Sequence, residues 1–307
     1  MQNLTVKNSL LFLCGLYFFF ISNAYAQEDL LASLDTIPQK SVRVLPTFKT
    51  TRIVNSHSVE TVKAHHLDFR VTHHFGNAGV KGGGHTIFGL DNASDIRIAF
   101  EYGVTDRLTV AAGRSKIGEM IDAYLKYRVL YQTEDNKVPI SLTLFANAAV
   151  TATDDISGPL STDFNNRLSY TYEALIARRF SSRFSWQLMP VLMHRNYVAD
   201  PQDENDLFAL GTGIRLRLTK HFALLADYYM IFSGYRADRK DLYFPPLGVG
   251  IEIETGGHVF HLHFTNNPGI LENSYLANST DSWQKGQFKF GFNISRTFGI
   301  GKKGRKA

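Results

Sequence analysis

The residues best placed to do chemistry are one carboxylate and two imidazoles near the end of the chain. Glu252 precedes the pair Gly256 and Gly257, and His261 and His263 follow it. If the two glycines form a two-residue hairpin turn, Glu252 lies opposite His261 on one face, and His263 lies one step along. These three side chains could relay a proton or bind a divalent metal. A hydrogen-bonded pair that stiffens the strands is the commoner outcome, so we expect no metal site and no cofactor.

A second group of imidazoles lies beside a glycine-rich stretch. His73 and His74 precede residues 76–84 (GNAGVKGGG), and His85 follows them. The glycines lack the spacing of a phosphate-binding loop, so a flexible surface loop is the better interpretation. No spacing of Ser, His and Asp predicts a catalytic triad, and we do not expect an enzyme.

The elements that position these side chains are strands in which apolar and polar residues alternate. The last of them, residues 287–300 (QFKFGFNISRTFGI), has one parity that is apolar except for Arg296 and another that is polar. Successive side chains of a strand point to opposite faces, so this segment forms a ribbon with one apolar face. We count twelve such strands between residues 65 and 300, each long enough to cross the apolar core of a bilayer.

The links between these strands alternate between short and long without exception. The short links lie at residues 105–107, 133–137, 181–183, 219–221 and 256–257. A soluble β-sandwich would also alternate apolar and polar residues, but alternating link lengths are typical of membrane barrels. The pattern predicts an all-β fold, a transmembrane up-and-down antiparallel β-barrel of about 12 strands with short periplasmic turns and long extracellular loops. Pro190 cannot donate a ladder hydrogen bond, so we expect a bulge or an early strand end beside it.

The chain divides into four parts. Residues 1–26 are predicted to be a signal peptide, with an apolar core, a small-residue cleavage site and the only cysteine of the chain. Residues 27–64 form a periplasmic N-terminal segment, for which a plug in the barrel and an extra strand are the open alternatives. Residues 65–300 form the barrel, and residues 301–307 form a basic C-terminal tail. A signal peptide followed by a barrel predicts location in the cell outer membrane.

The polar parity of each strand points into the predicted lumen, and its basic and acidic residues are equal in number. The predicted lumen-lining residues are Arg70, Arg97, Glu101, Lys126, Arg128, Glu173, Arg215, Arg217, Asp227 and Glu252. A pore selective for anions or cations would show an excess of one charge. The balance favours ion pairs between strands that brace the wall.

Four stretches resemble a known family. They are residues 47–60 (TFKTTRIVNSHSVE), 88–115 (FGLDNASDIRIAFEYGVTDRLTVAAGRS), 122–130 (DAYLKYRVL) and 292–298 (FNISRTF). With these stretches the chain is similar to a group of Bacteroidota β-barrel proteins classified as domain of unknown function DUF5777. The resemblance implies an outer-membrane barrel and carries over no activity or catalytic residue. The basic residues after Phe298 depart from the usual barrel, which ends at or near a terminal aromatic residue.

Composition and architecture together limit the function. The formal net charge of +5 lies partly in the tail, so it indicates no nucleic-acid surface. The expected partners are the lipid bilayer and the outer-membrane assembly machinery, which would recognise the C-terminal strand; soluble partners are not specified.

We expect a narrow pore or binding vessel for small polar solutes. The alternatives are a non-conducting structural or docking barrel whose lumen is closed by ion pairs, and a barrel enzyme with a site at its rim.

Overall fold

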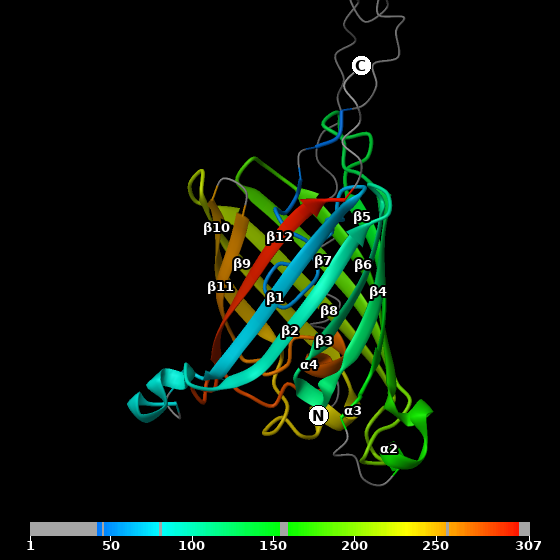
Figure 1. Cartoon of the computed structure of the whole chain (residues 1–307), viewed down its shortest axis with the longest axis vertical. Coiled ribbons are helices and arrows are strands. Elements are labelled where there is room, and N and C mark those ends of the chain that lie inside the picture. Colours follow the sequence, from blue (N-terminus) through cyan, green and yellow to red (C-terminus); the bar gives the residue numbers. More distant parts are fainter. Residues whose placement is uncertain (1–41, 45, 80–81, 154–158, 256–257, 301–307) are drawn as a thin grey trace, which may run out of the picture. The chain divides into compact units, whose positions relative to one another are not determined.

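Twelve strands form one closed antiparallel barrel in the computed structural model (Figure 1). Consecutive strands pair with each other, and β1 pairs with β12 to close the sheet. The predicted up-and-down barrel is therefore confirmed. The structure describes residues 42–44, 46–79, 82–153, 159–255 and 258–300. The predicted signal peptide, the C-terminal tail and the turn at 256–257 lie outside these residues.

The strands are eight to twelve residues long, close to the roughly 9–11 residues that a tilted membrane strand needs. Their bounds are β1 His66–Asn77, β2 Ala93–Gly103, β3 Leu108–Ser115, β4 Ile121–Leu130, β5 Ser141–Val150, β6 Leu168–Arg179, β7 Phe184–Arg195, β8 Asp206–Arg217, β9 Phe222–Phe232, β10 Leu247–Thr255, β11 His258–Thr265 and β12 Lys289–Gly299.

Side chains alternate across the wall as the sequence predicts. In β4, Ile121 and Leu125 are about half exposed on the outer face, whereas Asp122 and Lys126 are buried on the inner face. The outer face is apolar because it meets hydrocarbon, and the polar half of each ribbon is turned inward. The barrel thus carries most of the charged residues of its strands inside, with Arg114 and Arg296 among the exposed exceptions.

Short helices lie in the longer links and gather at one end of the barrel (Figure 1). They are η2 Gly84–Gly89, η3 Ile117–Glu119, α2 Pro159–Thr162, η4 Phe164–Arg167, α3 Gly234–Ala237 and α4 Glu272–Asn278. In the described part of the chain, every helix is too short or too polar to cross a membrane.

Pro190 lies inside β7 without the bulge or strand end that we expected beside it. β6 and β7 keep one register on both sides of it, with Glu173 opposite Val191 and Ile176 opposite Leu188. The pairing between these points is interrupted, since proline has no N–H to donate, while β7 stays paired with β8 throughout. The prediction was wrong because the strand gives up ladder bonds to one neighbour and keeps its register.

Two segments lie inside the barrel and fill much of its lumen. The first, residues 47–62, enters from the N-terminal side of β1 and contains a hairpin at residues 51–58 that is buried throughout. The second, residues 266–282, links β11 to β12 and contains α4, which is also buried. We call them the hairpin insert and the α4 insert. Among the described residues, the hairpin insert adds no strand to the barrel, and Arg43 before it forms an isolated β-bridge with Thr133 in the link between β4 and β5.

Candidate functional site

The hairpin insert closes on itself through backbone hydrogen bonds. The N–H of Ile53 donates to the carbonyl of Ser56, and the N–H of Ser58 donates to that of Thr51, both at 2.9 Å. The turn between them presents its remaining N–H groups outward, where they need acceptors because they are buried. The tip of the hairpin is therefore a cluster of donors directed at the barrel wall.

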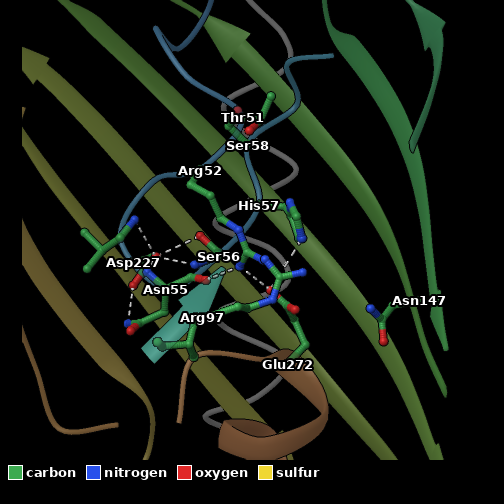
Figure 2. A network of polar contacts seen from close by, with 12 residues as sticks. Thr51, Arg52, Asn55, Ser56, His57, Ser58, Arg97, Asn147, Asp227 and Glu272 are labelled. Carbon is green, nitrogen blue, oxygen red and sulfur yellow. Dashed lines mark hydrogen bonds and ion pairs between the residues drawn. The ribbon is translucent and has the colours of Figure 1, made fainter. Parts of the chain in front are cut away.

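Asp227 of β9 supplies the acceptors for this tip (Figure 2). Its carboxylate accepts from the backbone N–H groups of Val54, Asn55 and Ser56 at 2.7–3.1 Å. The side chains of Asn55 and Ser56 donate to the same carboxylate at 2.8 Å. Hydrogen bonds to an ionised group are about twice as strong as neutral ones. Asp227 thus accepts five hydrogen bonds from the tip of the insert, and Asn293 of β12 donates one more to the carbonyl of Val54.

Arg52 joins the two inserts. Its Nη1 donates to the carbonyl of Asn55 and to Oε1 of Glu272 in α4, each at 2.8 Å (Figure 2). Both members of this ion pair are buried. Burial alone would lower the pKa of Arg52, but the charge of Glu272 raises it, and the net shift is upward. His57 lies beside them, and burial, followed by the charge of Arg52, lowers its pKa well below the ordinary value. His57 is therefore neutral.

Three further wall residues bind the hairpin insert, two through its backbone and one through a side chain. Nζ of Lys126 donates to the carbonyls of Ser58 and Glu60 at 2.7 and 2.6 Å. Gln187 accepts from the N–H of Val59 through Oε1, and its Nε2 donates to the carbonyl of His57. Arg128 forms an ion pair with the side chain of Glu60 at 2.8 Å. Wall side chains thus form hydrogen bonds with the backbone N–H and carbonyl groups of the insert, as a neighbouring strand would.

Glycines at two wall positions make room for the insert. A Cβ added at Gly213 would lie 2.5 Å from Cδ1 of Ile53, and one added at Gly248 would lie 2.5–2.6 Å from Asn55 and Val54. Cβ contacts this short do not occur without displacement. The barrel wall is therefore shaped to the hairpin.

Other lumen charges pair within the wall, as the charge balance predicts. Arg97 reaches across β3 to Asp122 at 2.6 Å, over Gly113, where a Cβ would lie 2.5 Å from the guanidinium. Arg70 bonds Asp68 of its own strand and Glu101 of β2 at 3.0 and 3.2 Å. These pairs are buried, so their geometry helps to fix the barrel's cross-section.

The structure brings two of the three candidate metal ligands together and places the third against another residue. Glu252 lies opposite His261 as predicted, with Oε2 at 3.5 Å from Nε2. Arg215 donates twice to the other oxygen of Glu252, at 3.0 and 2.7 Å. His263 lies against the ring of His74 instead, at 5.2 Å. Among the described residues, no group of three or more His, Cys, Asp or Glu side chains could hold a metal ion.

The ten predicted lumen residues take different roles. Asp227, Lys126 and Arg128 bind the hairpin insert, and five others form the wall ion pairs given above. Glu173 is buried with both carboxylate oxygens unpartnered in the described part of the chain. Arg217 is half-buried at the end of β8.

Sequence patterns did not identify the residues of the inserts that form the polar contacts, nor the uncharged wall residue that binds the hairpin insert. Arg52, Glu60 and Glu272 lie in segments without periodicity, and Gln187 carries no charge to mark it. The presence of paired charges inside a barrel gave no indication of which ones would serve a plug.

The longer links at the helical end are joined by a second polar network, which we call the loop cap. Asp203 accepts from Arg195 at 2.9 Å and from Arg236 at 2.7 Å, and Ser233 donates to Glu204 at 2.5 Å. Arg236 also donates to a carbonyl at the end of α4. Burial would raise the pKa of Asp203, but hydrogen bonds from Arg236 and Arg195 outweigh it and lower the pKa. The carboxylate is therefore ionised at neutral pH.

Comparison with known proteins identifies a family and a fold. A family model described as a membrane-bound beta barrel domain, DUF5777, matches residues 48–298. No curated protein matches the chain.

Solved structures that resemble this chain include two porins and an outer membrane protein, all of very different sequence. The NanC porin is 10% identical with a TM-score of 0.45, and the KdgM porin is 7% identical with a TM-score of 0.44. The outer membrane protein Omp33 of Acinetobacter baumannii is 9% identical with a TM-score of 0.40. Each match covers 76% of this chain and 98% of the other. Values of this size carry no information about function.

Proposed function

Because the chain belongs to the DUF5777 family of membrane-bound β-barrel domains, we propose that it is an outer-membrane barrel closed at rest by its own hairpin insert. When the insert moves, the charged half of the lumen becomes a narrow conduit or binding vessel for small polar solutes. The observation that carries the proposal is the seating of the hairpin tip on Asp227 by five hydrogen bonds.

The chemistry of the contacts supports reversible closure. The insert is held to the wall by hydrogen bonds, by the Arg128–Glu60 and Lys49–Glu254 ion pairs, and by apolar packing of four of its residues, Phe48, Ile53, Val54 and Val59. A hydrogen bond contributes about 0.5–1.5 kcal/mol net, and about 1.5–3 kcal/mol when one partner is charged. A lumen that has lost the insert keeps its charged wall and can hydrate. The hydrogen bonds and ion pairs of the insert can therefore be exchanged for contacts with water without unfolding the barrel.

Single-channel recording in a planar bilayer tests this proposal. The wild-type protein should be silent or show rare openings, because the inserts occupy the lumen. Asp227→Ala removes the acceptor for the hairpin tip and should give frequent openings. Asp91→Ala, which removes an exposed carboxylate from the link between β1 and β2, is the matched control and should behave as wild type. Steady wild-type currents equal to those of Asp227→Ala would contradict closure by the insert.

The second candidate is a docking barrel that never conducts. It is favoured by the loop cap, which ties the links around Asp203 and Arg236 to α4 and so fixes the surface at that end. Under this alternative, Asp227→Ala remains silent even though its hairpin is loosened. The same recordings therefore separate the two candidates, provided that the release of the hairpin is measured independently.

A further inference from the structure

Acidic and basic residues are few on the outer face of the described strands, and all but one of them have a polar partner within the protein. Arg114 of β3 forms an ion pair with Glu119 at 2.7 Å. Asp206 of β8 lies 2.7 Å from Nδ1 of His194 on β7. Arg178 of β6 donates to a backbone carbonyl and to an amide side chain of the link between β4 and β5. The exception is on the last strand.

This exception is Arg296, which lies on the outer face of β12 between β11 and β1 (Figure 1). It is exposed, and the register places Phe69 of β1 directly beside it. The other outward residues of β1 and β11 close to it are Leu67, Val71, His258 and Phe260. None of these described neighbours is a carboxylate. A cation that faces hydrocarbon without a counter-ion is strongly unfavourable, so Arg296 needs an anion from outside this part of the chain.

The side chain of Arg296 points toward the end of the barrel where the short links lie. Its Cζ is 5.0 Å from the centre of the Phe298 ring, and β12 ends at the next residue, Gly299. Aromatic residues near strand ends mark the boundary between hydrocarbon and headgroups in membrane barrels. A long basic side chain can lay its stem along apolar surface while its charged group reaches such a boundary. The guanidinium therefore lies at the level of the lipid headgroups.

The anion present at that level is the phosphate of a phospholipid headgroup. A guanidinium binds phosphate through two parallel hydrogen bonds, which a single ammonium cannot do. The chain beyond β12 is also basic, with Lys302, Lys303, Arg305 and Lys306. Basic residues that directly follow a membrane segment attract anionic lipids. Charge at this end of the barrel therefore favours an anionic headgroup.

A second copy of the chain fits this surface less well. A two-fold contact brings the same patch of both copies together, so each guanidinium would need a carboxylate from that patch. The described outward residues around Arg296 provide none. Such a contact would instead bring two cations close to each other.

We propose that Arg296, positioned by Phe298, binds the phosphate of an anionic phospholipid in the leaflet at the short-link end of the barrel. The acyl chains of this lipid lie along the neighbouring apolar wall, where the rings of Phe69 and Phe100 are 5.2 Å apart. The site goes beyond the proposed function, since it lies on the outer face and does not depend on whether the lumen opens.

Native mass spectrometry of the purified protein in non-ionic detergent tests the site, with phosphatidylglycerol as the probe. Diacylglycerol with the same acyl chains lacks the phosphate and is the control. We expect saturable binding of phosphatidylglycerol at concentrations at which diacylglycerol does not bind, without competition from inorganic phosphate. Equal binding of diacylglycerol would overturn the proposal, and competition by inorganic phosphate would show that the site takes a soluble anion instead of a lipid.

Three variants assign the binding to this position. Arg296→Gln should weaken phosphatidylglycerol binding roughly tenfold or more, because it removes the charged donor. Arg296→Lys keeps the charge but not the paired donors, so its loss should be smaller. Arg114→Gln removes an exposed arginine that already has a carboxylate partner, and it should bind as wild type. Unchanged binding in Arg296→Gln, or an equal loss in Arg114→Gln, would contradict the assignment, as would a wild-type dimer that Arg296→Gln dissociates.

Discussion

At the scale of single residues, Asp227 shows how a barrel can hold a segment that has no strand partner. A tight turn leaves several N–H groups without internal acceptors, and burial makes each of them costly. A carboxylate has two oxygens with several acceptor positions, so one side chain can serve three backbone donors and two side-chain donors. The role of Asp227 is thus to replace the water that would otherwise solvate the tip.

Replacing Asp227 with Ala should release the hairpin insert. Each buried donor left unpaired costs about 1–3 kcal/mol, and three backbone donors lose their acceptor. Arg52, a trypsin site buried in the wild-type protein, should then become cleavable in the folded, detergent-purified barrel. Asp91→Ala is the control. If Arg52 stays as resistant in Asp227→Ala as in wild type, other contacts hold the insert.

Acid should loosen the loop cap only at low pH. The folded pKa of Asp203 lies below its unfolded value of about 3.9, so its stabilising contribution is fully present above that value. The contribution is lost as the pH falls through the lowered folded pKa. Protease resistance of the links around Asp203 should therefore be constant from pH 7 to about pH 5 and decline below about pH 4. Asp203→Asn should be sensitive at every pH, and a decline of the wild type near pH 6 would point to another group.

At the scale of elements, the strands could be predicted, whereas a plug was only one of two open alternatives for residues 27–64 and the α4 insert was not predicted. Alternation fixes both the faces and the register of a strand, because lipid and lumen impose opposite demands on successive side chains. Residues 47–62 and 266–282 have no such period, since their surroundings are protein on every side. The hairpin insert contacts Asp227 and Lys126, which are distant in the sequence, so these contacts leave no periodic pattern. The prediction of a bulge or strand end at Pro190 was wrong for a related reason. Pairing with the neighbouring β8 keeps β7 extended where proline removes a hydrogen bond.

The outer face of β12 provides a direct test of the membrane assignment. Ile294 lies at the centre of this strand and is exposed on the outer face. Ile294→Arg should cost about 2–4 kcal/mol at the bilayer midplane, whereas Phe298→Arg, near the strand end, should cost about 0–1 kcal/mol. Folding into lipid vesicles, followed by denaturant titration, measures both. Equal costs at the two positions would mean that this face does not meet a bilayer.

The fit between wall and insert can be broken from the wall side. Gly248→Val places carbon atoms where Asn55, Val54 and Oδ1 of Asp227 now lie, so the hairpin should be displaced from the wall. Channel openings should increase, as for Asp227→Ala. Gly84, where an added Cβ meets nothing, provides Gly84→Ala as the control. Silence of Gly248→Val together with an exposed hairpin would favour the docking barrel.

At the scale of the whole molecule, the protein is a membrane barrel whose inner charges serve two structures at once. Arg97 and Asp122 brace the wall, Asp227 and others bind the insert, and Arg70 and Glu101 do both because each is also hydrogen-bonded to Thr51. Counting charges in the sequence gave the balance but could not divide it between these tasks.

The account depends most on the hairpin being seated in the lumen, and amide hydrogen exchange of the membrane-reconstituted protein measures this directly. The N–H groups of Val54, Asn55 and Ser56 donate to Asp227, so they should exchange orders of magnitude more slowly than in a free peptide of the same sequence. Asp227→Ala should speed their exchange and leave that of the strand amides unchanged. Exchange of residues 51–58 at the rate of the free peptide in the wild-type barrel would contradict the account.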